Sequence, residues 1–481
     1  MILILDEEGR VLRAMTTTRK TAKKPLSALA LTMALSVVLA SCADSSASEN
    51  NDAQTPAETT ETEPAQAQEA SARTPRIAVT YEGGVKYLDA LTLEEVGDTA
   101  AQGFIRLNQA GDNRHLFLST GGGFELLDAG AWAQAHGDHA HYYTQTPAST
   151  GVVKEATTPG HAVVHDGLTA LFDDGTGKVD VYESAHIAEG EEPVMTWQAP
   201  EAHHGVAVPR ADGSLVVTIG TEEERTGVAI IAADGSTVTE NTECPGVHGE
   251  AAAQDGRIVV GCQDGVLIID GDTITKVESP DDYGRIGNQS GSPESPIVLG
   301  DYKSDPDADL ERPTRISLIN TETAELQLVD IPSSYTFRSL ARDDDGNALV
   351  LGTDGAIHVI DPVKAKVTTS IPVIEAWEEP EEWQKPRPTI FFLDGMAYVT
   401  DPATNRVIIV DTVAGEVWKE ATLEVTPNEL NGITGGEPSH EGHDHGEEDH
   451  AEDDHADEEH GDDEHTDDEH AEDHEHDGHD H

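Results

Sequence analysis

The chain has 481 residues, of which 93 are Asp or Glu and only 29 are Lys or Arg, so its formal net charge is −64. A protein this acidic repels nucleic acid and anionic membrane surfaces, which excludes binding to either through bulk electrostatics. We therefore expect no nucleic-acid partner.

Residues 1–41 are predicted to be a secretory signal. A basic stretch that includes Arg19 and Lys24 precedes an apolar run over 26–40, which is too short to span a bilayer comfortably. Leu-Ala-Ser followed by Cys42 resembles the lipobox of bacterial lipoproteins. Two acyl chains on Cys42 would anchor the exported protein to the outer face of the cell membrane, whereas an ordinary secretory signal is the alternative. Residues 1–14 stand ahead of this signal, so Met15 is an alternative start.

Residues 42–72 are expected to be a disordered linker. They are rich in Ala, Ser, Thr, Glu, Gln and Pro and contain no aromatic residue. Such a segment cannot bury enough apolar surface to fold, so it would act as a flexible tether for the next domain.

Residues 73–434 are predicted to form a single all-β domain, a β-propeller. Short apolar strands alternate with Gly, Asp and Pro turns, and no amphipathic helix interrupts them. The phrases DGRIVVGCQDGVLIIDG, DGNALVLGTDGAIHVIDP and DGMAYVTDPATNRVIIVDT, which start at Asp255, Asp345 and Asp394, repeat one pattern. The repeat of about 40 to 55 residues is the length of a four-stranded blade. We expect about eight blades, closed by the stretch 430–434; seven is the alternative because the unit over 285–332 is irregular.

Two cysteines remain once Cys42 carries lipid. In an exported protein Cys244 and Cys262 are expected to form a disulfide. A metal-binding role is the alternative, and it is disfavoured because a thiolate ligand outside the cell would compete with oxidation.

Three consecutive units carry histidine near the start of their innermost strand, namely His161, then His203 with His204, then His248. Innermost strands line the channel of a propeller, so equivalent positions of successive blades approach one another. Imidazole nitrogens about 2.0–2.1 Å from a common ion would form a tetrahedral Zn²⁺ site. The alternative is a set of channel-lining histidines that bond to backbone and water.

A further group of histidines lies just upstream, in the segment AHGDHAHYY. The spacing of His136, His139 and His141 is interpreted as a mobile loop that folds over the channel mouth and supplies or exchanges ligands. Of the remaining histidines of the domain, His115 and His358 lie within predicted strands and are expected to be structural. His165 and His186 are expected to be ordinary turn or strand residues.

Residues 435–481 are predicted to be a disordered, metal-binding tail. The last forty-two residues contain twelve histidines among Asp and Glu, with no Lys or Arg. Imidazole and carboxylate are ligands that Zn²⁺ prefers, although nickel and copper also favour imidazole. A solvated low-complexity tail is the alternative. The predicted tail ligands are His443, His445, His450, His455, His460, His465, His470, His474, His476, His479 and His481.

The sequence phrases around the histidines of the β domain, above all HHGVAVP and CPGVHGEA, resemble those of the AztD-type zinc metallochaperones of bacteria. Members of that family are extracytoplasmic β-propellers encoded with a zinc ABC importer. The resemblance implies that Zn²⁺ is bound and passed by direct contact to the importer's solute-binding protein, with no enzymatic activity. It assigns metal binding to His136, His139, His141, His204 and His248, and further to His161 and His203. The lipobox and the long acidic tail depart from the periplasmic pattern.

Two other functional classes remain as alternatives. A propeller enzyme, such as a metal-dependent lactonase or a quinoprotein-like dehydrogenase, would usually hold Ca²⁺ with carboxylate and amide ligands, whereas these positions are rich in histidine. The sequence shows neither a nucleophile–base arrangement beyond chance nor a phosphate-binding glycine motif. A surface interaction propeller with a metal-buffering tail is the second alternative.

Overall fold

The computed structural model describes residues 67–137 and 139–438. The predicted signal segment, Cys42 and most of the predicted tail lie outside the described residues. No helix among the residues described is long and apolar enough to cross a membrane. Two single-turn 3₁₀ helices, Ser184–His186 and Gln254–Gly256, are the helices within this part of the chain.

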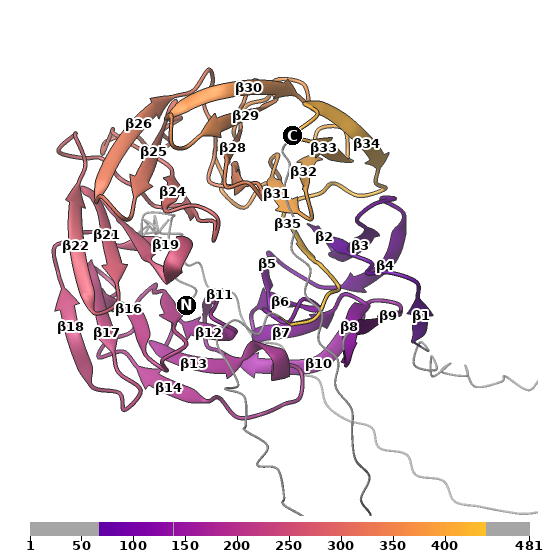
Figure 1. The fold of residues 1–481 in the computed structure, drawn as a ribbon, viewed down its shortest axis with the longest axis horizontal. Helices are drawn as coiled ribbons and strands as arrows, with labels where there is room; N and C mark the ends of the chain where they lie inside the picture. The colour runs from indigo at the N-terminus through magenta and orange to yellow at the C-terminus, as the bar shows by residue number, and fades with distance from the viewer. Residues whose placement is uncertain (1–66, 138, 439–481) are drawn as a thin grey trace, which may run out of the picture. The chain divides into compact units, whose positions relative to one another are not determined.

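Eight four-stranded antiparallel sheets form the ring of a propeller (Figure 1). The prediction of an all-β propeller is confirmed, and the blade number is eight. From the innermost strand outwards, the first four sheets are β35 (Leu430–Ile433), β2 (Arg76–Tyr81), β3 (Gly84–Asp89), β4 (Glu95–Ala100); β5 (Arg106–Gln109), β6 (His115–Thr120), β7 (Gly123–Asp128), β10 (Ala148–Glu155); β11 (Pro159–His165), β12 (Leu168–Asp173), β13 (Lys178–Glu183), β14 (Met195–Gln198); and β15 (Ala207–Pro209), β16 (Leu215–Gly220), β17 (Arg225–Ile231), β18 (Thr237–Asn241).

The remaining four sheets follow in chain order, and the irregular unit over 285–332 supplies one of them. They are β19 (His248–Ala252), β20 (Ile258–Cys262), β21 (Gly265–Asp270), β22 (Thr273–Glu278); β23 (Gln289–Ser290), β24 (Ile297–Gly300), β25 (Arg315–Asn320), β26 (Glu325–Asp330); β27 (Leu340–Arg342), β28 (Ala348–Leu351), β29 (Ala356–Asp361), β30 (Lys366–Pro372); and β31 (Ile390–Leu393), β32 (Met396–Asp401), β33 (Arg406–Asp411), β34 (Glu416–Thr422).

The hydrophobic core lies between neighbouring blades. The middle strands are buried along nearly their whole length, as in β6 and β21, because a blade packs against each face. The outermost strands alternate between exposed and half-buried residues, as in β26. One interblade cluster contains Val163, Val208 and Val260 from three successive sheets. This arrangement explains why the middle strands read as continuous apolar runs.

The ring closes as the sequence predicts, because β35 pairs antiparallel with β2 and places Ile433 opposite Arg76. We call the rim of the ring at which Ile433 and Arg76 lie the terminal rim. The innermost strands begin at the opposite rim, which we call the mouth rim. The turns that join the second and third strands, such as the one between β6 and β7, also lie at the mouth rim, because neighbouring strands in a blade are antiparallel.

A three-stranded sheet stands outside the regular blades. It consists of β1 (Gln68–Ala70), β9 (His139–Thr144) and β8 (Ala131–His136), in that order. The hairpin β8–β9 follows β7, which runs from the mouth rim to the terminal rim. The hairpin therefore leaves the ring at the terminal rim, and Figure 1 places it at the perimeter beside β4 and β10. A Cβ added to Gly435 would lie 3.2 Å from the Cβ of Ala131, so the C-terminal end of the ring adjoins the hairpin base.

Candidate metal centres

Three histidines from consecutive blades converge at the mouth rim. His161 lies in β11, His204 lies just before β15, and His248 is the first residue of β19. Each stands near the start of the innermost strand of its blade, where equivalent positions face the channel. The three side chains offer ligand nitrogens within 4.8 Å of one another. We call them the channel triad.

The spacing of the nitrogens in the channel triad matches a tetrahedral metal ion. His204 Nε2 lies 3.4 Å from His161 Nε2 and 3.3 Å from His248 Nε2. Two ligands of a tetrahedral Zn²⁺ ion with bonds of about 2.0–2.1 Å are separated by roughly 3.3–3.4 Å. Two neutral imidazoles can share one hydrogen bond at this distance, but a third ring at the same point favours a common ion. The fourth ligand position is left for another group.

The opposite ring nitrogens are held by the surrounding protein. His204 Nδ1 lies 2.6 Å from the Asp174 carboxylate, and His248 Nδ1 lies 2.7 Å from the carbonyl oxygen of Gly287. An acceptor at Nδ1 places the proton there and leaves Nε2 as the free ligand atom. Asp301 in turn accepts from the Gly287 N–H at 2.7 Å, which fixes the turn that carries this carbonyl.

A glycine next to His248 permits this close packing. Gly249 has φ of +72°, and a Cβ there would lie 2.3 Å from Gln289 Oε1 and 2.5 Å from the Gly287 carbonyl oxygen. A side chain at this position would push away the carbonyl that orients His248. The Val-His-Gly-Glu sequence therefore has a geometric reason for its glycine.

Burial and neighbouring side chains keep two imidazoles of the channel triad neutral, those of His161 and His248. Burial first, and then the neighbouring His204, Arg106 and Arg225, hold the pKa of His161 well below its usual value of 6.5. The pKa of His248 is likewise lowered, first by burial and then by His204 and Arg285. Neutral imidazole is the form that ligates a metal, so these two rings need not lose a proton when an ion binds near neutral pH.

One carboxyl group faces the channel triad from inside the channel. The Glu250 carboxylate lies 3.8 Å from His161 Nδ1, and both side chains are 20% exposed. Burial raises the pKa of Glu250 to about 8. Glu250 lines a cavity of about 290 Å³ deeper in the channel, together with residues such as His165 and Phe391.

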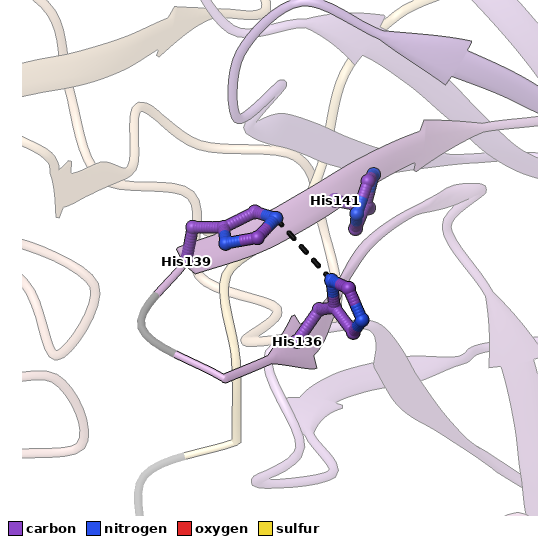
Figure 2. A group of neighbouring side chains, drawn as sticks. All are labelled: His136, His139 and His141. Carbon is purple, nitrogen blue, oxygen red and sulfur yellow. Dashed lines mark hydrogen bonds between the residues drawn. The ribbon is translucent and has the colours of Figure 1, made fainter.

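A second histidine cluster lies on the hairpin β8–β9 (Figure 2). His136 ends β8 and pairs across the turn with His139, while His141 lies two residues further along β9. Residues i and i+2 of a strand share a face, and directly paired residues are neighbours on that face. The H-x-x-H-x-H spacing thus puts three rings on one face of a hairpin. His136 Nδ1 lies 3.3 Å from His139 Nε2. We call this group the hairpin triad.

The prediction of a loop over the channel mouth is wrong on two counts. The segment forms regular strands, because its residues alternate sides and the turn between His136 and His139 is short enough for a hairpin. The hairpin also leaves the ring at the terminal rim, whereas the channel triad lies at the mouth rim. The hairpin triad and the channel triad are therefore separate candidate sites and do not share ligands.

The prediction that the linker is disordered up to residue 72 is also wrong at its end. Gln68–Ala70 form β1, which pairs with β9 along Tyr142 to Thr144. The open edge of β9 supplies the backbone partners, so no apolar pattern is needed in β1. Glu69 Oε1 lies 2.9 Å from His141 Nδ1 and thereby orients this ring as Asp174 orients His204.

Replacing Glu69 with Gln should weaken metal binding at the hairpin triad by about tenfold, because outer partners of ligating histidines typically contribute 10–100-fold. The measurement is a zinc titration of the full chain in which all twelve tail histidines are Gln. Glu240→Gln, at an exposed position of β18, is the matched control. Equal loss in both variants would contradict a specific role for Glu69.

His203 does not join the channel triad, although the sequence analysis included it. Its ring is 2% exposed, with Nδ1 2.9 Å from the Glu201 carbonyl and Nε2 3.2 Å from both oxygens of Thr218. The next residue, His204, faces the channel instead, so these two adjacent side chains point to opposite sides.

The other four histidines of the domain lie apart from both triads. His115 and His358 are buried within β6 and β29, His165 bonds to the Pro209 carbonyl, and His186 lies in a 3₁₀ turn. The predicted disulfide between Cys244 and Cys262 is present. The predicted tail ligands lie outside the described residues.

Sequence reasoning missed the groups that position the ligands. Asp174 sits in a turn sequence, Asp-Asp-Gly, that is common in propellers, so nothing marks it as a histidine partner. The Gly287 carbonyl carries no side-chain signal at all. Glu69 lies in a polar stretch with several other acidic residues, and only the pairing of β1 with β9 distinguishes it.

Comparison with known proteins supports the resemblance to AztD-type chaperones that the sequence analysis gives. The chain is 26% identical over 375 residues to the zinc chaperone AztD of Citrobacter koseri, covering 75% of this chain and 86% of that protein. The crystal structure of Citrobacter koseri AztD has a TM-score of 0.66 at 24% identity, over 75% of this chain and 98% of that one. Its apo structure gives 0.65 at 23% identity, over 76% and 98%.

A more distant likeness concerns the fold alone. Dihydro-heme d1 dehydrogenase NirN in complex with DHE has a TM-score of 0.50 at 11% identity, with 78% of each chain covered. No family model matches the chain.

Proposed function

We propose that this protein is an extracytoplasmic zinc metallochaperone in which the channel triad holds the transferred ion. The observation that carries the proposal is that His204 Nε2 lies 3.3–3.4 Å from the Nε2 atoms of both His161 and His248, which suits one tetrahedral ion. The 26% identity to a zinc chaperone supports zinc as the cargo. The disulfide supports an oxidising compartment outside the cytoplasm.

The two rims have different roles in this proposal. At the terminal rim two rings of the hairpin triad are exposed and the third is partly buried, so this rim would collect zinc. The tail histidines would also collect zinc. The mouth rim holds the channel triad, and release there would pass zinc to the solute-binding protein of a zinc importer. Neutral imidazoles leave an ion one at a time, which suits transfer by ligand exchange. A lipid on Cys42 would keep the protein at the outer face of the cell membrane.

Counting tightly bound zinc in a variant without tail ligands tests the proposal. In the full chain with all twelve tail histidines replaced by Gln, we expect two ions to bind, one at each triad. Competition with a chelator of known affinity separates tight sites from weak ones. Binding of no ion in this variant would leave the propeller without a metal role and would favour an interaction propeller with a buffering tail.

Zinc binding at the channel triad should persist as the pH falls through the ordinary histidine range. Because the pKa values of His161 and His248 lie well below 6.5, protons compete with the metal at these two rings only at lower pH. The affinity should therefore change little between about pH 7.5 and 6.5, where ordinary imidazoles begin to protonate. Chelator competition at a series of pH values, with hairpin and tail histidines replaced by Gln, measures this. A steep fall over that interval would contradict the assignment of these rings as ligands.

A further inference from the structure

A cavity of about 450 Å³ opens at the mouth rim directly over the channel triad, and His204 and His248 form part of its wall. The fourth ligand position of a bound ion would therefore face this cavity. Glu250 lies on the inner side of the channel triad and lines the deeper cavity instead, so it does not reach into the mouth.

Positive side chains line this cavity although the chain carries a net charge of −64. Arg106, Arg285 and Lys303 are part of its wall. Arg106 has one distant ion pair, at 3.8 Å to Glu429, whose carboxylate also accepts from Arg338 at 2.9 Å. Three cations at one opening of an acidic protein would repel a metal ion unless an anion accompanied it.

The acidic residues of the cavity wall already serve other groups. Asp174 accepts from His204 and from the Gly205 N–H at 3.2 Å. Asp301 accepts from the N–H groups of Gly287 and Asn288 at 2.7 and 3.0 Å. Both carboxylates are thus held in place within the site, and the cations of the cavity wall outnumber them by three to two.

A fourth cation is buried near the channel triad. Arg225 is 8% exposed, and its buried Nη1 has no hydrogen-bond partner within the described residues. Burial and the neighbouring Arg285 lower the pKa of Arg225 to about 10, while the charge of Asp174 opposes this shift. A divalent ion held by three neutral imidazoles keeps its full charge, so this surrounding strongly favours an anionic fourth ligand.

Aromatic side chains form another part of the wall, beside polar residues such as Thr158 and Asn288. Phe104 and Trp383 pack edge to face with ring centroids 4.8 Å apart, and Phe337 lies on the same wall. Such rings provide contact area for the stem of an entering side chain, which a small free anion would not use.

We infer that the mouth cavity admits an aspartate or glutamate side chain of a partner protein, whose carboxylate becomes the fourth ligand of the metal on the channel triad. Arg106 and Lys303 guide the carboxylate, and the aromatic wall contacts its stem. A metal–oxygen bond forms first, and metal–nitrogen bonds then break one by one, leaving neutral imidazoles. No electron is transferred and no proton is required. This inference rests on the proposed metal role of the channel triad.

The test uses Co²⁺, whose visible absorption reports its ligands, bound to the full chain with hairpin and tail histidines replaced by Gln. N-acetyl-aspartate methylamide is titrated into this complex, with the corresponding asparagine compound as its matched control. We expect the aspartate compound alone to change the Co²⁺ spectrum. Arg106→Gln and Lys303→Gln together should weaken its binding by about tenfold or more, as the loss of charge-assisted contacts predicts.

Lys364→Gln is the control variant, because Lys364 is 73% exposed and pairs with Asp361 away from the cavity. Equal aspartate binding in the Arg106/Lys303 variant and in this control would overturn the inference. If acetate binds as tightly as the aspartate compound, the cavity is a site for small free carboxylates, and the inference that a partner's side chain enters it is wrong. Failure of Co²⁺ to bind at all would instead contradict the proposed function. Arg106→Gln alone, at an exposed position, remains testable if the double variant does not fold.

Discussion

Replacing His204 with Ala should abolish tight zinc binding at the mouth rim while leaving the hairpin triad unchanged. His204 is the central residue of the channel triad, since its Nε2 lies 3.4 Å from His161 Nε2 and 3.3 Å from His248 Nε2. We expect the affinity of the channel triad to fall by at least about 100-fold, because the loss of an outer partner alone typically costs 10–100-fold. Asp174→Asn should give that smaller loss, since the ligand remains but its orienting carboxylate is gone.

The measurement is chelator competition on the full chain with tail histidines replaced by Gln, which resolves the two triads by affinity. His165→Gln is the matched control, because His165 lies on the same strand as His161 and bonds to the Pro209 carbonyl. The expected result is one ion bound in His204→Ala and two in His165→Gln. Two tightly bound ions in both variants would show that the channel triad is not a metal site.

The propeller could be predicted because its signal is local and repeated. Each blade contributes a turn, a buried strand and a second turn, and the phrases from Asp255, Asp345 and Asp394 repeat this pattern. The innermost strands follow from the same pattern, so His161, His204 and His248 could be placed together. Of the histidines predicted at the channel, His203 lies elsewhere, because a loop residue before a short strand has no fixed periodicity to show which neighbour faces the channel.

The hairpin arrangement and the partners of the channel triad could not be predicted, because they involve contacts between distant parts of the chain. The spacing of His136, His139 and His141 fits both a flexible loop and one face of a hairpin. The hairpin consists of pairs between β8 and β9, and Gln68–Ala70, which lie more than sixty residues upstream, pair with its outer edge. The partners of the channel triad, Asp174 and the Gly287 carbonyl, come from other turns and become neighbours only when the ring closes. Sequence periodicity carries no information about such contacts.

Removing the disulfide should destabilise the propeller and weaken the channel triad together. Cys244 and Cys262 are 18 residues apart, and closing a loop of this size is worth ~3 kcal/mol of unfolding free energy. The bond also fixes the segment that carries the third ligand. Cys244 precedes His248 by four residues, and His248 pairs with Gly261, the neighbour of Cys262. We expect the double variant Cys244→Ser and Cys262→Ser to lose that stability in denaturant unfolding and to bind zinc at the channel triad about tenfold more weakly, equivalent to ~1.4 kcal/mol.

Zinc binding at the hairpin triad provides the internal control, because that site lies at the terminal rim and shares no residue with the disulfide. Its affinity should be the same in the double variant and in the parent chain. Chemical reduction of the parent chain should reproduce both losses, which separates the missing bond from any effect of serine. An unchanged denaturation midpoint would contradict the stabilising role. A lower midpoint with unchanged zinc affinity at the channel triad would show that β19 and β20 hold His248 in place without the covalent link, and that the bond serves the fold alone.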